Sequence, residues 1–221
     1  MTVVLKVGGA STEGVADAVA RLREAGHAVC VVHGAGPQIS DEMLRRGLEV
    51  RFVAGRRVTT PAALEVVRES LAAVNAAVCA AVGRLAVPLA GDEIGLLAEP
   101  VPELGLVGTA VPSTPGPIVR ALGDGRIPVV TPLAAGPLNV NADEAAAALA
   151  VGIGAHRIQF LTDVAGVFHD GALLRSIQAE QAESLIGEGL FEGGIVPKLI
   201  AAVRAARGGL AAEIGETAVY A

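Results

Sequence analysis

Two segments of the sequence pair a rare lysine with adjacent glycines. The chain has 221 residues and fifteen arginines but only two lysines. Lys6 begins the segment Lys6–Gly9, after an apolar run, and Lys198 ends the segment Gly193–Lys198. Glycines let backbone amides approach an anion closely, and a lysine adds a compact positive charge. A lysine in the first turn of a helix opposes the helix dipole, so Lys198 indicates a nearby anion. Both segments are typical of phosphate sites, although a plain strand-to-helix turn would also explain the first.

A third glycine-rich segment, His33–Gly36, joins an apolar run to an expected helix. Free amides and the helix dipole coincide at such a junction, which favours an anion. The segment lacks the third glycine of a dinucleotide-binding fingerprint, because Ile39 stands there, and no P-loop lysine follows. We interpret His33 as a structural histidine rather than a catalytic base.

Two polar segments could complete an anion site. The adjacent arginines of Gly55–Thr59 could grip a carboxylate through paired hydrogen bonds, or could be solvated surface residues. In Asn139–Asp143, Asn141 is suited to capping the helix that follows. Asp143 then falls in the first turn, where the helix dipole favours a carboxylate. Capping alone would explain this second segment.

The elements that must position these segments alternate between short apolar runs and amphipathic patterns. This alternation predicts an α/β fold, a three-layer αβα sandwich around a mainly parallel sheet, as one domain over residues 1–221. Such a sheet places ligand sites at the carboxyl ends of its strands. The stretch 132–138, rich in glycine and proline, predicts a boundary between lobes of about 1–138 and about 139–221. We expect strands at 3–7, 28–33, 86–89, 95–99, 105–111, 127–131, 157–162 and 217–220, and helices at 13–25, 37–46, 61–82, 115–122, 142–154, 178–187 and 195–207.

Composition narrows the class of protein. The formal net charge is −6 and aromatic residues make up 2% of the chain, which excludes nucleic acid as an expected partner. No apolar run is long enough to span a bilayer, and no signal peptide precedes the first strand. We expect a cytoplasmic protein whose Cys30 and Cys79 are buried thiols. No cysteine or histidine cluster predicts a metal site.

The sequence resembles the amino acid kinase family in seven segments that follow the family's order. They are KVGG (Lys6–Gly9), VVHGAGPQI (Val31–Ile39), GRRVT (Gly55–Thr59), ELGLVG (Glu103–Gly108), NVNADEAAAALA (Asn139–Ala150), LTDVAGV (Leu161–Val167) and GGIVPK (Gly193–Lys198). Together they cover nearly the whole chain. The resemblance is strongest to the members that transfer a phosphoryl group from ATP to the side-chain carboxylate of N-acetyl-L-glutamate, the second step of arginine biosynthesis.

The resemblance implies a role for each matching residue. Lys6 and Lys198 would stabilise the phosphoryl group in transfer, and Asp143 would organise the two lysines. The acyl amino acid would bind near Gly9, Gly34, Ala35, Gly36, Arg57, Asn139 and Asn141, with Arg57 holding its α-carboxylate and Asn139 its acylated amino end. ATP would bind near Lys6, Gly8, Gly9, Thr162, Asp163, Val164, Gly166, Val167, Phe168, Leu190, Phe191, Glu192 and Lys198. Mg²⁺ would bind mainly through the ATP phosphates, with no protein ligand predicted.

Three departures from the family pattern bear on these roles. Ala35 replaces the middle glycine of HGGG and would be strained if that position required a positive φ. The tail after Lys198 is short, which predicts a trimmed adenine pocket or sheet edge. No extra helix precedes the first strand, which predicts an arginine-insensitive homodimer.

Alternative functions remain open on the sequence. One is a kinase for a related substrate, either N-acetyl-aminoadipate or an acidic amino acid linked to a carrier protein. An acidic carrier would require a basic groove, and Arg45, Arg46, Arg51 and Arg56 cluster in sequence. Another is a sensor that binds ligands on the same fold without catalysis.

Overall fold

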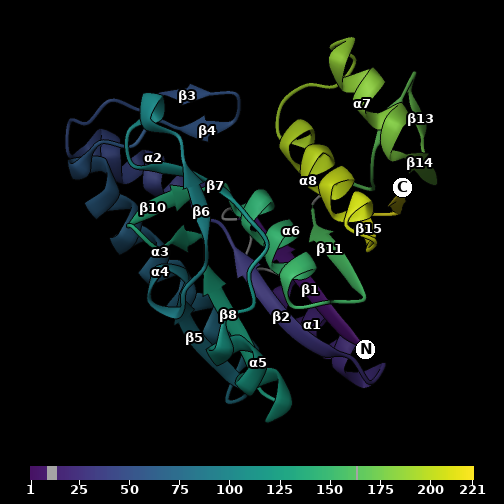
Figure 1. The fold of residues 1–221 in the computed structure, drawn as a ribbon, viewed down its shortest axis with the longest axis horizontal. Helices are drawn as coiled ribbons and strands as arrows, with labels where there is room; N and C mark the ends of the chain where they lie inside the picture. Colours follow the sequence, from purple (N-terminus) through teal and green to yellow (C-terminus); the bar gives the residue numbers. More distant parts are fainter. Residues whose placement is uncertain (9–13, 163) are drawn as a thin grey trace.

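The central feature of the computed structural model is an eight-stranded sheet (Figure 1). The structure describes residues 1–8, 14–162 and 164–221. The strand order is β14-β16-β15-β11-β1-β2-β8-β5, and all neighbours are parallel except β15 with β16. The bounds are β1 Thr2–Val7, β2 Ala28–His33, β5 Ala86–Ala90, β8 Ile127–Thr131, β11 Arg157–Leu161, β14 Ser176–Gln178, β15 Ala211–Ile214 and β16 Thr217–Tyr220.

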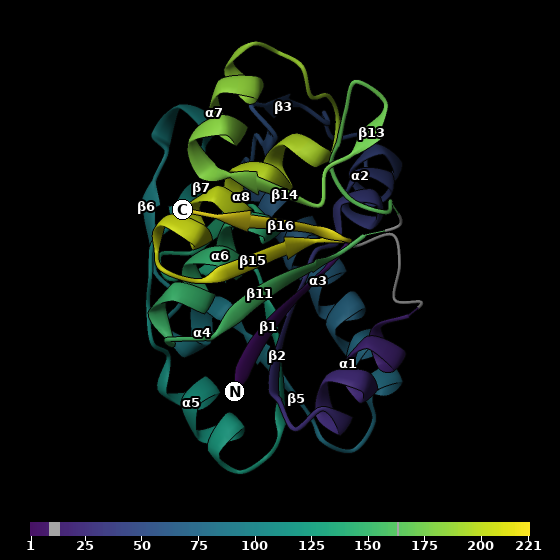
Figure 2. The ribbon, with the colours of Figure 1, turned by 90° about the vertical axis from the view of Figure 1, so that its right-hand side faces the viewer.

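Helices cover the two faces of this sheet, as Figure 2 shows. One layer holds α1 (Val15–Glu24), α2 (Gly36–Arg45) and α3 (Pro61–Val82). The other holds α5 (Gly116–Gly123), α6 (Ala142–Gly152) and α8 (Ile195–Arg207), and α7 (Ala179–Gly187) packs beside α8. The predicted three-layer αβα arrangement is therefore confirmed.

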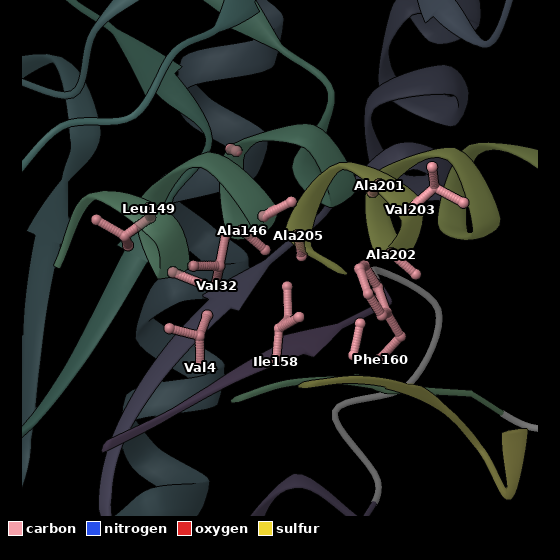
Figure 3. Close-up of a cluster of buried hydrophobic side chains, with 14 of the residues drawn as sticks. Val4, Val32, Ala146, Leu149, Ile158, Phe160, Ala201, Ala202, Val203 and Ala205 are labelled. Atoms are coloured by element: carbon pink, nitrogen blue, oxygen red, sulfur yellow. The ribbon is translucent and has the colours of Figure 1, made fainter. Parts of the chain in front are cut away.

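The alternation of side chains along β1 divides the core in two. Successive strand residues point to opposite faces. Val3 and Leu5 accordingly pack with α1 and α3, whereas Val4 packs with α6 and α8. Figure 3 shows the second cluster, in which small alanines of α6 and α8 lie over the sheet. Lys6 lies on the same face of β1 as Val4, which directs it toward α6.

The longest predicted element matches the structure closely. Helix α3 spans Pro61–Val82, as predicted, and the side-chain oxygen of Thr60 accepts a hydrogen bond from the amide of Ala63. The final strand at 217–220 is also confirmed. The helix expected at 13–25 appears as α1, and residue 13 lies outside the described residues.

Short elements were missed by the sequence patterns. The expected strand at 95–99 is displaced, because the short helix α4 ends at Ile94 and the strand begins at Ala98. The predicted lobe boundary lies inside β10, whose Asn139 pairs with Val107 of β7. The expected strand at 105–111 appears as β7 Val107–Ala110, which pairs with β6 Ala98–Pro100 and β10 Leu138–Val140. The elements that had no sequence prediction are α4 Gly91–Ile94, a 3₁₀ turn at Pro102–Leu104, the strands β10 and β9 Leu133–Ala134, and two hairpins, β3 Phe52–Val53 with β4 Arg56–Arg57, and β12 Phe168–His169 with β13 Ala172–Leu173. Strands β14 and β15 of the central sheet were also unpredicted.

Both cysteines are free thiols, and Cys30 is fully buried. Burial raises the pKa of Cys30 to about 12 and also raises that of Cys79, so Cys30 in particular is protonated and unreactive near neutral pH. Among the described residues, no helix is both long and apolar enough to cross a membrane.

Candidate functional site

A cavity of about 620 Å³ opens at the carboxyl ends of β1, β2 and β11. This volume falls within the range of small-molecule sites. The predicted segments converge on it because parallel strands end at one edge of the sheet. Its lining includes Lys6, Gly8, Gly34, Ala35, Gly36, Arg56, Arg57, Asn139, Asn141, Asp143, Thr162, Gly194 and Lys198.

Lys6 and Asp143 form a buried ion pair in the wall of this cavity. The Lys6 Nζ atom lies 2.7 Å from Oδ1 of Asp143, and the two side chains are 6% and 8% exposed. Burial lowers the pKa of Lys6, and the Asp143 carboxylate opposes that effect. The aspartate therefore favours the charged form of an ammonium group that is shielded from water.

Lys198 brings a second ammonium group to the same cavity. It is the fourth residue of α8 and is half-buried, and its Nζ donates to the carbonyl oxygen of Gly194 at 3.1 Å. Its positive charge lowers the pKa of Lys6. Two cations that line one cavity favour an anionic ligand in it.

The glycine-rich segments supply space and backbone at the cavity wall. A side chain at Gly8 would meet no atom within 4 Å, so a ligand can approach this backbone. Gly36 begins α2, whose N-terminus lies at the cavity. The amide of Gly34 donates to the carbonyl oxygen of Val7. Gly9, predicted to bind both ligands, lies outside the described residues.

Ala35 fits its position without backbone strain. Its φ is −146°, which lies outside the left-handed region that favours glycine. The methyl group is buried beside the cavity, where Ala35 is 2% exposed. The departure from the HGGG pattern therefore narrows the pocket rather than distorting it.

Arg57 is a buried guanidinium group without an acidic partner among the described residues. It is 5% exposed and donates to the carbonyl oxygen of Gly36 at 3.0 Å and to Oγ of Ser40 at 2.8 Å. Its guanidinium carbon lies 4.6 Å from the ring centroid of Phe52, close enough for a cation–π contact. Burial lowers the pKa of Arg57. An anionic ligand in the cavity would supply the missing counter-charge.

The asparagines of the segment Asn139–Asp143 serve two different structural purposes. Asn141 caps α6, because its Oδ1 accepts from the amides of Asp143 and Glu144 at 2.8 and 3.2 Å. This confirms the capping interpretation. Asn139 donates from Nδ2 to Oγ1 of Thr59 at 3.0 Å. Both asparagines line the cavity.

The predicted nucleotide-binding residues lie partly outside this cavity. Thr162 lines it, whereas Val164, Gly166, Val167, Phe168, Leu190, Phe191 and Glu192 do not. Asp163 lies outside the described residues.

Two segments of that nucleotide-binding set nevertheless lie together. The rings of His169 and Phe191 are 6.5 Å apart, which brings β12 beside the segment 190–192. Gly166 allows close packing, because a β-carbon there would lie 2.5 Å from Oγ1 of Thr217. Val164 and Phe168 are about half exposed and could contact a ligand beyond the cavity.

His33 is a neutral structural histidine, as the sequence indicated. The Asn75 side-chain amide donates to the carbonyl oxygen of Val129 and lies 3.1 Å from Nε2 of His33. An amide nitrogen only donates, so Nε2 accepts and Nδ1 donates to the carbonyl oxygen of Gly34. Burial lowers the pKa of His33 to about 4.

The arginines of the suggested basic groove are mostly neutralised. Arg45 and Arg46 both pair with Glu42, and Arg46 also pairs with Glu69. Arg56 forms two hydrogen bonds of 3.0 Å to the carboxylate of Glu144.

Sequence reasoning missed Glu144, Phe52 and Ser40. Glu144 follows Asp143 directly, so its place in the first turn of a capped helix was the available signal. The described residues contain no group of three or more histidine, cysteine, aspartate or glutamate side chains that could hold a metal ion.

Comparison with known proteins places these features in a wider group. The sequence model of the amino acid kinase family matches residues 1–215. An acetylglutamate kinase from Rubrobacter xylanophilus is 41% identical over 222 residues, which cover 96% of this chain and 88% of that protein. An acetylglutamate kinase from Acidothermus cellulolyticus is 42% identical over 249 residues, with coverage of 96% and 81%.

Solved structures agree with the fold. The protein smu.665 from Streptococcus mutans superposes with a TM-score of 0.88 at 25% identity and covers 99% of this chain and 98% of its own. A carbamate kinase from Giardia lamblia, bound to citric acid, gives a TM-score of 0.75 at 14% identity, with coverage of 99% and 98%. At that identity the second likeness concerns the fold alone.

Proposed function

The chain belongs to the amino acid kinase family, and from that premise we propose that it phosphorylates the side-chain carboxylate of N-acetyl-L-glutamate with ATP, a step of arginine biosynthesis. One observation carries the proposal. The cavity combines the Lys6 and Lys198 cations with Arg57, a buried guanidinium group that has no acidic partner among the described residues. Such a cavity suits a ligand with two anionic ends, one reacting and one held.

The reaction needs charge neutralisation rather than proton removal. A carboxylate is already ionised near neutral pH, so no general base must activate it. One carboxylate oxygen forms a bond to the γ-phosphorus of ATP, the bond from that phosphorus to the β-phosphate oxygen breaks, and ADP leaves. Lys6 and Lys198 neutralise the charge on the transferring group, and Asp143 keeps Lys6 protonated and in place.

The acyl amino acid lies between Arg57 and the lysines in this proposal. Arg57 holds the α-carboxylate, and Asn139 contacts the acylated amino end. Gly34, Ala35 and the neighbouring Ile39 form the wall beside the acyl group. Asn141 fixes the start of α6. The amides of Gly8 and Gly36 face the phosphates in this proposal, and the family resemblance assigns Gly9 to the same ligand. Shape and charge thus orient the side-chain carboxylate toward the γ-phosphorus.

ATP enters from the β11 side in this proposal. Its phosphates reach Lys6 and Lys198, with Mg²⁺ arriving as part of the nucleotide substrate. Thr162 lies beside the phosphates, and the half-exposed Val164, Phe168 and Leu190 offer apolar contact to the nucleoside. The family resemblance assigns Asp163 to the same nucleotide. Gly166, Val167, Phe191 and Glu192 belong to the same two segments and complete the nucleotide site in this proposal.

A carrier-linked substrate is not favoured by the surface charges. Arg45, Arg46 and Arg56 already pair with glutamates, which weakens the attraction of this surface for an acidic protein. We propose that the enzyme is cytoplasmic, where its free cysteines would stay reduced. We also propose that it forms a homodimer, in keeping with the family resemblance. Light scattering tests the dimer.

A hydroxylamine trap tests the proposed reaction. Hydroxylamine attacks an acyl phosphate and releases phosphate. The hydroxamate that remains forms a coloured complex with ferric iron, which can be measured. N-acetyl-L-glutamate with ATP and Mg²⁺ should give far more hydroxamate than N-acetyl-aminoadipate or a carrier-linked glutamate. Binding of both ligands with no hydroxamate from any of these substrates would contradict catalysis and favour a sensor.

A further inference from the structure

Glu144 joins three elements that carry the site. Its carboxylate accepts hydrogen bonds from Nε and Nη2 of Arg56, both at 3.0 Å, and lies 3.5 Å from Nη1 of Arg204. The Arg56 and Glu144 side chains are 19% and 11% exposed, whereas Arg204 is 48% exposed. The pair with Arg56 is therefore the sheltered, two-point contact, in which geometry as well as charge is specified.

Each of the three elements also holds a predicted ligand-binding residue. Arg56 precedes Arg57 on the β3–β4 hairpin, Glu144 follows Asp143 on α6, and Arg204 shares α8 with Lys198. A second contact ties two of these elements, the hairpin and the start of α6, because Nδ2 of Asn141 donates to the carbonyl oxygen of Gly55 in the hairpin turn at 3.4 Å. The contacts thus connect the held end of the substrate with its reacting end.

The hairpin has little other apolar anchorage. Phe52 and Val53 are 51% and 44% exposed, so β3 buries little apolar surface. The hairpin stands apart from the central sheet at the top of the molecule (Figure 1). Arg57 ties the hairpin to α2 through Gly36 and Ser40, and the polar contacts of Gly55 and Arg56 tie it to α6.

We propose that Glu144 is a positioning residue that, through Arg56, fixes the distance of Arg57 from Lys6 and Asp143. This inference rests on the proposed function, because it assigns Arg57 to the α-carboxylate of the acyl amino acid. Without the pair, the hairpin moves away from α6, and the substrate is held less firmly at the end remote from the reaction.

A competing role for Arg56 predicts the opposite behaviour. If Arg56 itself bound the substrate carboxylate, Glu144 would compete with that substrate. Removing the charge of Glu144 would then free Arg56 and lower KM. The direction of the change in the Glu144→Gln variant therefore separates positioning from direct binding.

Steady-state kinetics on four variants test the positioning role. Arg56→Gln and Glu144→Gln should each raise KM for N-acetyl-L-glutamate about tenfold while KM for ATP stays within about twofold. The double variant should also show about a tenfold increase, since residues that act through one contact are not additive. Arg56→Lys, which keeps the charge but not the two-point geometry, should be intermediate.

A control variant removes an exposed arginine–glutamate pair elsewhere in the chain. Arg207→Gln breaks the exposed contact between Arg207 on α8 and Glu183 on α7 and should leave both KM values unchanged. A hundredfold increase in the double variant, an increase in KM for ATP equal to that for the acyl amino acid, or a lower KM in Glu144→Gln would each overturn the proposal.

Amide hydrogen exchange provides a readout that does not depend on activity. In Arg56→Gln and Glu144→Gln, amides of residues 52–57 should exchange at least about fivefold faster, while those of β1 and β2 stay protected. Unchanged exchange in the hairpin would overturn the positioning role, even in a protein that lacks kinase activity. Faster hairpin exchange in a protein with no activity on any acyl amino acid would instead reject the proposed function.

Discussion

Replacement of Asp143 by asparagine would remove the charge that balances Lys6 while nearly preserving the shape of the side chain. The two groups are 2.7 Å apart, and both side chains are less than one tenth exposed. Burial lowers the pKa of Lys6, and the carboxylate of Asp143 is the largest influence that opposes this effect. In the variant, Lys6 must stay charged without its partner or lose its proton.

The cost of either outcome can be estimated. Removing one partner of a buried ion pair costs about 3–5 kcal/mol. Deprotonation sets an upper limit, because neutralising a lysine of ordinary pKa 10.5 costs about 1.4 kcal/mol for each pH unit below that value. The limit is about 5 kcal/mol at pH 7 and about 2 kcal/mol at pH 9.

The sign of the pH dependence follows from proton binding. In the variant, the folded state holds Lys6 with a pKa below that of the unfolded chain, so it binds fewer protons. The free energy of unfolding of the variant therefore rises toward that of the wild type as pH increases through this window. The deficit should be about 3–5 kcal/mol at pH 7 and no more than about 2 kcal/mol at pH 9.

Urea unfolding followed by circular dichroism measures this deficit. Glu183→Gln, which removes an exposed pair with Arg207, is the control and should cost less than about 1 kcal/mol at both pH values. A deficit below about 1 kcal/mol for Asp143→Asn at pH 7, or one that does not shrink at pH 9, would refute this account of the pair.

Three further predictions concern single residues. Lys198→Ala should lower kcat by at least about a hundredfold, because one of the two cations that neutralise the transferring group is lost. Its circular dichroism spectrum should stay unchanged, since the half-buried side chain hydrogen-bonds only to Gly194 in the described structure. A near-normal kcat would show that Lys198 does not take part in the reaction. Arg57→Gln should raise KM for the acyl amino acid about a hundredfold in steady-state kinetics, with Arg51→Gln, a substitution of an exposed arginine, as control. Equal effects in both variants would contradict the role of Arg57. Burial lowers the pKa of His33 to about 4, so the folded state binds this proton less readily than the unfolded chain does. The contribution of His33 to the free energy of unfolding is therefore complete above pH 6.5 and should fall by about 3 kcal/mol as pH drops toward 4, measured by urea unfolding. The same pH dependence in His33→Gln would assign this loss to other groups.

Local sequence signals predicted the elements that hold the site. Helix α3 has a capping threonine, a proline at its first position and a long apolar pattern, so Thr60 and Val82 mark its ends in both sequence and structure. The place of Lys6 at the cavity was also predictable, because parallel strands present their carboxyl ends at one edge. Arg57 on the β3–β4 hairpin and Lys198 on α8 were expected at the same site from the family resemblance.

Contacts between distant segments could not be predicted in the same way. Arg56 and Glu144 are 88 residues apart in sequence, and their pairing depends on where the hairpin lies over α6. Strands of two residues, such as β3 and β9, are too short for a recognisable alternation. The backbone of Ala35 was likewise undecided, since its φ follows from how β2 passes into α2.

Nuclear magnetic resonance of the product tests the central claim most directly. N-acetyl-L-glutamate labelled with ¹³C at the side-chain carboxylate is incubated with ATP, Mg²⁺ and the protein. If Arg57 holds the α-carboxylate and the lysines face the side chain, the labelled carbon should shift and couple to phosphorus. Coupling at the α-carboxylate in a sample labelled there, or coupling at neither carbon while ATP is bound, would contradict this arrangement of the site.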